Sequence, residues 1–112
     1  MKPEEYADLD ATALAALIRD NEVSCTEAVE AAIDIAERRN PDINAMSFEA
    51  FDHAPKAAKA HSGEGVFAGV PFLLKEALGE YPGWPDRKGS RSMAHYVSQE
   101  STELIRPSRG SP

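Results

Sequence analysis

Residues 65–76 read Gly-Val-Phe-Ala-Gly-Val-Pro-Phe-Leu-Leu-Lys-Glu, and the nine residues from Val66 to Leu74 carry no charge. An uncharged apolar run of this length is typical of a strand that is covered on both faces of a sheet. Pro71 lacks the N–H that a strand ladder needs, so it belongs at a strand start, a bulge or an edge. The sequence therefore predicts a buried strand that ends at Lys75.

Lys75 is the residue in this stretch whose side chain could take part in a reaction. Two interpretations apply to it. Burial disfavours the ammonium form of a lysine and so favours a neutral amine that can act as a base. Alternatively, Lys75 and Glu76 simply mark the point where the strand reaches water. Local sequence spacing does not separate these alternatives.

A pair of helices is predicted upstream of the strand. Asp10, or Asp8 two residues earlier, is suited to cap a helix over about residues 10–20, because its carboxylate can accept from the free N–H groups of a first helical turn. Ser24-Cys25-Thr26-Glu27 matches a capping box and predicts a second helix that stops at Asn40-Pro41. Joined by a short loop, the two helices would form an antiparallel hairpin whose apolar faces need a third surface.

Two shorter elements are predicted between this hairpin and the apolar run. Residues 45–51 contain three large apolar side chains and predict a short strand. Asp52 is suited to cap a third helix that continues through Lys59, with Pro55 tolerated in the first turn. This helix is rich in alanine, so we expect it to bury little area.

The region after Lys75 changes in composition. Residues 79–92 are rich in Gly, Pro and mixed charge and predict a long loop, in which Trp84 more plausibly covers the loop than stacks on a ligand. Residues 101–106 predict a final short helix, which Pro107 ends. Residues 107–112 contain no apolar side chain that could pack, so we expect a polar tail there.

Length and composition limit the function classes. The 112 residues are enough for one domain, and alanine supplies much of the 42% hydrophobic fraction, so the core is expected to be thin. The net charge is −7, and the first fifty residues carry 4 basic and 12 acidic side chains. Nucleic acid is therefore not an expected partner, because binding it requires clustered Lys and Arg. The sequence also contains no apolar run of bilayer-spanning length and no signal-peptide pattern. We expect a cytoplasmic protein that does not contact membranes.

The remaining chemistry-bearing residues show no recognisable site pattern. His53, His61 and His95 lack the spacing and partner ligands of a metal site, and Cys25 is the only cysteine, which excludes an internal disulfide. Ser90 and Ser111 lack the flanking residues of a nucleophile elbow. We therefore expect no metal and no cofactor.

Residues 65–76 resemble the Gly-Val-Pro-x-x-x-Lys-Asp segment of the amidase signature family, with Glu76 where that family usually has Asp. Further similar segments lie on both sides of it, and the resemblance extends from about residue 8 to residue 106. These segments are residues 10–15, 23–29, 40–45, 89–91 and 101–105.

The resemblance implies an α/β fold in which a helical hairpin is followed by strands of a mixed sheet flanked by helices. It also implies hydrolysis of small-molecule carboxylic amides by a serine–serine–lysine triad, with Lys75 as the catalytic lysine. A neutral amine would take a proton through a bridging serine, so that a second serine attacks the carbonyl carbon. In the family both serines follow the lysine at a distance beyond residue 112.

The absence of these serine motifs leaves three hypotheses. The first is the N-terminal fragment of an amidase domain over residues 1–106 with a non-family tail over residues 107–112, inactive by itself. The second is a non-catalytic truncated product or interaction fragment, and the third is an amidotransferase A-type subunit. Apolar faces that a missing sheet would cover also predict self-association.

Overall fold

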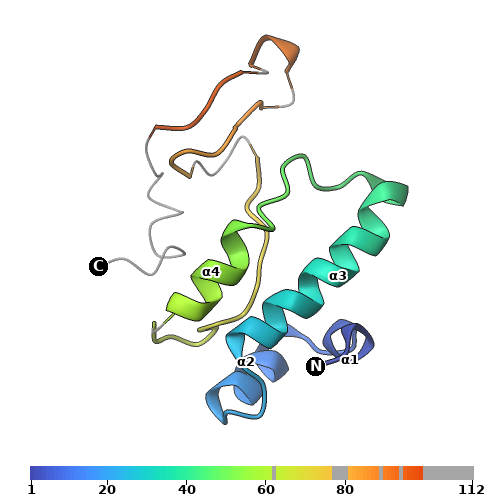
Figure 1. Ribbon diagram of the computed structural model, residues 1–112, viewed down its shortest axis with the longest axis vertical. Coiled ribbons are helices and arrows are strands. Elements are labelled where there is room, and N and C mark those ends of the chain that lie inside the picture. The colour runs from blue at the N-terminus through green and yellow to red at the C-terminus, as the bar shows by residue number, and fades with distance from the viewer. Residues whose placement is uncertain (62, 77–80, 89, 94, 100–112) are drawn as a thin grey trace. The chain divides into compact units, whose positions relative to one another are not determined.

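The computed structural model describes residues 1–61, 63–76, 81–88, 90–93 and 95–99. Figure 1 shows four helices in the first half of the chain and mainly irregular backbone after them. By their internal contacts the residues divide into two units, Met1–Pro71 and Phe72–Pro112, which we describe separately. The elements are α1 (Pro3–Ala7), α2 (Ala11–Arg19), α3 (Cys25–Ile43), α4 (His53–Ala60) and a 3₁₀ turn, η1 (Arg91–Met93).

Helices α2 and α3 begin where their capping residues predict. The Asp10 carboxylate accepts from the Ala13 N–H at 2.8 Å, and the Ser24 hydroxyl accepts from the Glu27 N–H at 3.0 Å. Each bond satisfies one of the N–H groups that a helix leaves unpaired in its first turn. The predicted start of each helix is therefore confirmed.

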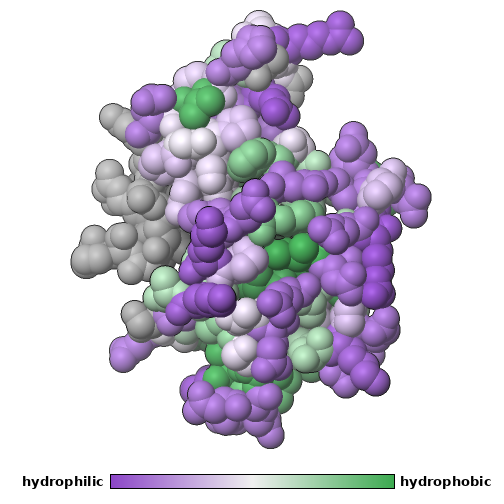
Figure 2. Space-filling view, viewed as in Figure 1, coloured by the Kyte–Doolittle hydropathy of each residue, from purple (hydrophilic) through white to green (hydrophobic). Residues whose placement is uncertain are grey.

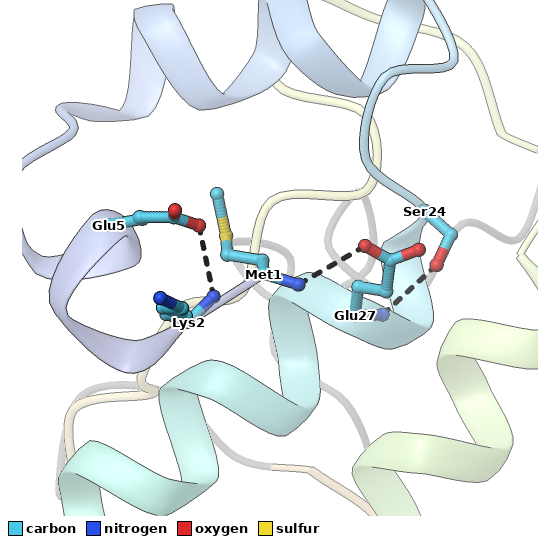
Figure 3. A network of polar contacts seen from close by, with 5 residues as sticks. All are labelled: Met1, Lys2, Glu5, Ser24 and Glu27. Atoms are coloured by element: carbon cyan, nitrogen blue, oxygen red, sulfur yellow. Dashed lines mark hydrogen bonds and ion pairs between the residues drawn. The ribbon is translucent and has the colours of Figure 1, made fainter.

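The capping box at Ser24 is only half formed. Rather than reaching back to Ser24, the Glu27 carboxylate pairs with the N-terminal ammonium of Met1 at 3.4 Å (Figure 3). In the same view the Lys2 N–H donates to Glu5 at 3.0 Å, which closes the first turn of α1. The short helix α1, which the sequence patterns did not predict, is thus held at its start by one local bond and packs on α3.

Helix α3 extends beyond the predicted stop at Asn40-Pro41. It includes Pro41 in its last turn and ends at Asn44, whose left-handed backbone (φ 49°) forms the C-cap. The Asn44 N–H donates to the Asn40 carbonyl at 2.6 Å. Asparagine tolerates this conformation better than most residues, so the end of the helix is set by Asn44.

The strand predicted over residues 45–51 is wrong, because this segment is a loop in the structure. The Asn40 side chain holds it: its Oδ1 accepts from the Met46 N–H at 2.8 Å, and its Nδ2 donates to the Glu49 carboxylate at 3.2 Å. A side-chain amide that occupies the Met46 backbone N–H replaces the ladder bond that a strand would make there.

Helix α4 confirms the third predicted helix, with Pro55 in its first turn. Asp52 precedes it but makes no side-chain cap bond. The reason is its helical backbone (φ −82°, ψ −33°), since a capping side chain reaches the first-turn N–H groups from an extended backbone. Helix α4 packs along α3 in the first unit.

Small residues dominate the core of the described part of the chain. The fully buried apolar side chains are Leu14 and Ala15 of α2 and Ala28 and Ala31 of α3. Alanine removes little apolar area from water, so each contributes little stabilisation. The expectation of a thin core is therefore in agreement with the structure.

The buried strand predicted over residues 66–74 is also wrong for this structure. Gly65 and Gly69 have positive φ angles of 144° and 84°, which a strand does not contain, and the Val70 N–H bonds back to the Phe67 carbonyl at 3.1 Å in a turn. The side chains are not covered either, since Val66 is 74% exposed and Phe67 55% exposed. Among the described residues no strand pairs with this segment. In the view of Figure 2, apolar side chains remain visible between hydrophilic ones.

Candidate active site

Lys75, the predicted catalytic residue, lies in the second unit at the end of an extended segment that begins at Phe72. Its side chain is exposed, and Nζ forms no hydrogen bond or ion pair with any residue that the structure describes. The neighbouring Glu76 is half-buried and has an interaction partner. By itself this arrangement fits a solvated charge, because a general-base lysine requires apolar walls that the described residues do not provide.

The first unit contains the close contact that precedes this lysine in the chain. After α4 the chain returns to the beginning of α3 (Figure 1), where Gly69 lies against Ile18 of α2 and Cys25 of α3. A Cβ atom at Gly69 would lie 2.5 Å from Cys25 Sγ and 3.1 Å from Ile18 Cγ2. The backbone at Gly69 is therefore closely packed against the start of α3 and the Cys25 thiol.

In the second unit, residues 83–86 of the predicted long loop pair with residues 96–98, which follow that loop. The Gly83 N–H donates to the Ser98 carbonyl at 2.8 Å, and the Ser98 N–H donates to the Trp84 carbonyl at 2.9 Å. Pro85 and Val97 form an isolated antiparallel bridge between the Ser98–Trp84 bond and a bond from the Asp86 N–H to the Tyr96 carbonyl at 3.4 Å. The Trp84 ring stacks on Tyr81 at 4.3 Å between centroids, so the structure shows Trp84 covering the loop.

A buried charge is the feature of this unit that the sequence patterns missed. Asp86 is 2% exposed and pairs with Lys88 Nζ at 3.0 Å, and that ammonium also lies 5.8 Å from the centre of the Tyr96 ring. A carboxylate this buried needs a cationic partner, which Lys88 supplies from two residues away. An Asp-x-Lys pair in a polar loop carries no sequence signal that would reveal the burial of the carboxylate.

None of the three serines that the structure describes in this unit, Ser90, Ser92 and Ser98, hydrogen-bonds to a base. Ser90 is exposed and its hydroxyl lies 2.8 Å from that of Ser92. Ser98 is buried, and its hydroxyl has no partner among the described residues. Nucleophilic activation requires an adjacent proton acceptor, so the structure does not assign a nucleophile here. Ser111 lies outside the described residues, as do the predicted final helix over residues 101–106 and the tail over residues 107–112.

The structure does not bring the other candidates together. His53, His61 and His95 are all exposed, and Cys25 is a free, half-buried thiol. Within residues 1–61, 63–76, 81–88, 90–93 and 95–99, no group of three His, Cys, Asp or Glu side chains could hold a metal ion. In the same part of the chain, no helix combines the length and apolarity that crossing a bilayer requires.

Curated relatives of this chain are proteins named as amidases and amide hydrolases. The amidase AmiC of Mycobacterium tuberculosis is 39% identical over 104 residues, which is 92% of this chain and 22% of AmiC. The 6-aminohexanoate-cyclic-dimer hydrolase of Pseudomonas sp. is 46% identical over 67 residues, 60% of this chain and 13% of that enzyme. The indoleacetamide hydrolase of Bradyrhizobium diazoefficiens is 33% identical over 99 residues, 82% of this chain and 19% of that protein. No family model matches the chain.

A solved structure is similar in both sequence and fold. It is a bacterial aryl acylamidase of the amidase signature enzymes, with a TM-score of 0.75 and 31% identity over 81% of this chain and 20% of the acylamidase. The chain thus spans about a fifth of the length of the relatives that it matches over most of its own length. The sequence resemblance is confirmed by these comparisons.

Proposed function

Because this chain belongs to the amidase signature family, whose N-terminal part it matches in sequence and in fold, we propose that it supplies the general-base lysine of an amide hydrolase. The observation that supports the proposal is the place of Lys75, four residues after Pro71 of the Gly69-Val70-Pro71 segment and within a match that covers 92% of the chain. The substrate class that the relatives' names support is a small carboxylic amide.

The proposed chemistry assigns one proton-transfer role to Lys75. Its neutral Nζ accepts the hydroxyl proton of a bridging serine, which in turn accepts the proton of the nucleophilic serine. The nucleophilic oxygen bonds to the carbonyl carbon, the C–N bond breaks, and the leaving amine takes the proton back. Water then cleaves the resulting ester and releases the acid. Both serines would come from the part of an amidase that this chain does not span.

The same proposal gives the exposed apolar segment a structural role. In an assembled amidase domain, the other segments of a mixed α/β sheet would cover the apolar side chains of residues 66–74. Covering Val66 and Phe67, now 74% and 55% exposed, would contribute about 25 cal/mol for each square ångström of apolar surface removed from water. We assign residues 1–106 to this domain and residues 107–112 to a polar tail outside it.

A fusion tests the catalytic role of Lys75. Residues 1–106 are joined to the C-terminal four-fifths of Mycobacterium tuberculosis AmiC, and release of ammonia or acid is measured on simple amides. We expect Lys75→Arg to abolish turnover as fully as Lys75→Ala, because a guanidinium keeps its proton at any working pH and cannot serve as a base. Lys59→Ala, in the exposed face of α4, is the matched control and should leave turnover unchanged.

Two results bear directly on the proposal. Substantial turnover of the Lys75→Arg fusion would show that the residue acts only as a charge, and the proposed role would be wrong. The 112-residue chain without the added segment should hydrolyse no amide, because a base without a nucleophile offers no covalent route. Hydrolysis by the chain alone that is lost in Lys75→Ala would contradict the need for added serines.

A second candidate function is favoured by one observation. Lys75 is exposed and Val66 and Phe67 are uncovered, which is the surface expected of a non-catalytic interaction fragment. This candidate predicts that the fusion is folded and inactive, whatever residue stands at position 75. An active fusion that depends on Lys75 excludes it.

A further inference from the structure

The segment between α4 and Lys75 meets the helices through a glycine that no other residue can replace without displacement. Gly69 has φ of 84°, a backbone conformation that costs any L-residue with a side chain. A Cβ there would also lie 2.5 Å from Cys25 Sγ, closer than packed atoms approach, and 3.1 Å from Ile18 Cγ2, which is a tight contact. Backbone conformation and steric contact thus both require glycine at this position.

The contact joins three elements of the first unit. Ile18 lies near the end of α2, and Cys25 is the first residue of α3, directly after the Ser24 cap. Gly69 lies against both of them, in a segment whose two turns are closed by the Ala68 N–H to the Gly65 carbonyl at 3.3 Å and the Val70 N–H to the Phe67 carbonyl at 3.1 Å. The segment is therefore held against the point where α2 leads into α3.

We infer that Gly69 is a positioning residue: its contact with the Cys25 thiol holds the segment on the helices and sets the starting point of the chain that carries Lys75. This inference rests on the proposed function only for its last step, the effect on the lysine. The packing of Gly69 on Cys25 is a property of the first unit, so it can be tested without any catalytic activity.

The structure supplies a matched control for the conformational cost. Gly83 has φ of 86°, nearly the same as Gly69, but a Cβ built there meets no atom within 4 Å. Alanine at either position therefore has the same unfavourable φ. Only at Gly69 does its methyl group also overlap neighbouring side chains. The difference between the two variants isolates the contact with Cys25 and Ile18.

Amide hydrogen exchange in the 112-residue chain gives the first readout. We expect Gly69→Ala to lower the protection factors of Ala68 and Val70 by at least about tenfold. The added methyl group would overlap its neighbours, and local opening of the segment would relieve that overlap. Gly83→Ala should lower the protection factor of its own neighbour Trp84, whose N–H donates to the Tyr81 carbonyl, by a smaller factor. Cys25→Ala removes the sulfur, so Gly69→Ala in that background should restore most of the protection.

Several outcomes overturn the inference. Equal effects of Gly69→Ala and Gly83→Ala would mean that only backbone strain acts, and a failure of Cys25→Ala to rescue would mean that the thiol is not the contact. Loss of helical circular dichroism in Gly69→Ala that Cys25→Ala does not restore would likewise contradict a local contact. Recovery of both signals in the double variant supports it.

The amidase fusion gives the second readout. Gly69→Ala should lower kcat several-fold with little change in KM, and adding Cys25→Ala should restore kcat. The reason is that the substitution displaces the proposed base, Lys75, and not a residue that binds the substrate. If exchange responds and kcat does not, Gly69 holds the segment without positioning Lys75, and the inference is wrong. The Lys75→Arg result is independent of this comparison, so failure of the inference and failure of the proposed function are distinguishable.

Discussion

Single polar side chains determine where the helices of this chain begin. Asp10 and Ser24 each accept one backbone N–H, and both bonds join residues three positions apart in the sequence. Such bonds depend only on local backbone geometry, which is why the capping pattern alone was sufficient to predict them. Glu27 is the exception, because its carboxylate pairs with the distant Met1 ammonium.

At the residue scale we predict that Ser24→Ala lowers the free energy of unfolding by about 1 kcal/mol, because the Glu27 N–H loses its acceptor. Chemical denaturation followed by circular dichroism measures the change. Ser24→Asp is the matched control, since a carboxylate keeps an acceptor at the N-cap and should remain near the wild-type stability. An Ala variant as stable as the wild type would show that the bond contributes nothing.

At the scale of elements, an exposed ion pair joins α1 to α3. Arg38 of α3 donates to Glu4 at 3.2 Å and to Asp34 at 2.8 Å. A hydrogen bond from its own backbone and the bond from Arg38 lower the pKa of Glu4 below 4.5, and burial raises the pKa of Tyr6 above 10.0. The pair between Glu4 and Arg38 therefore forms with Glu4 in its charged form.

The shifted Glu4 predicts a pH dependence for α1. Its folded-state pKa lies below the unfolded value, so its contribution is complete above pH 4.5 and is lost as the pH falls through the folded pKa. We expect the side-chain NMR titration of Glu4 to move toward 4.5 in Arg38→Gln. The matched control is Arg39→Gln, which should leave the midpoint unchanged. Equal midpoints in wild type and Arg38→Gln would contradict the assigned role of Arg38.

At the scale of the whole molecule, the apolar stretch and the thin core have the same cause. Four of the exposed large apolar residues lie between residues 66 and 73, and the buried apolar residues of the described chain include three alanines. A chain that spans about a fifth of its relatives' length retains apolar side chains that, in a longer domain, we expect other segments to cover. Uncovered apolar surface of this kind favours association between molecules.

We therefore predict concentration-dependent self-association of the 112-residue chain. Sedimentation velocity should show species larger than the monomer, and replacing Val66 and Phe67 together by Ser should shift the population toward the monomer. Ile43→Ser is the matched control, because Ile43 is 67% exposed but lies outside the stretch. A monodisperse monomer with a sharp cooperative melt would contradict both the association and the marginal stability expected of a thin core.

Local signals explain which parts of the fold could be predicted. The starts of α2 and α3, the whole of α4 and the family resemblance around Lys75 depend on residues close together in sequence, and all of them agree with the structure or the comparisons. The catalytic role of Lys75 stays a prediction. The strands predicted over residues 45–51 and 66–74 failed because a strand requires a partner, and apolar composition does not supply one.

The sequence by itself determined the caps at the starts of α2 and α3, the acidic first half and the family, because each depends on residue identity and short spacing. Only the tertiary structure decided that Asn40 holds the loop through Met46, that Asp86 is buried on Lys88, and that Gly69 lies on Cys25. Asn40 and Asp86 act on nearby residues, but their burial and orientation follow from the packing around them. The Gly69 contact joins residues far apart in the chain, and no local pattern encodes a distance of this kind.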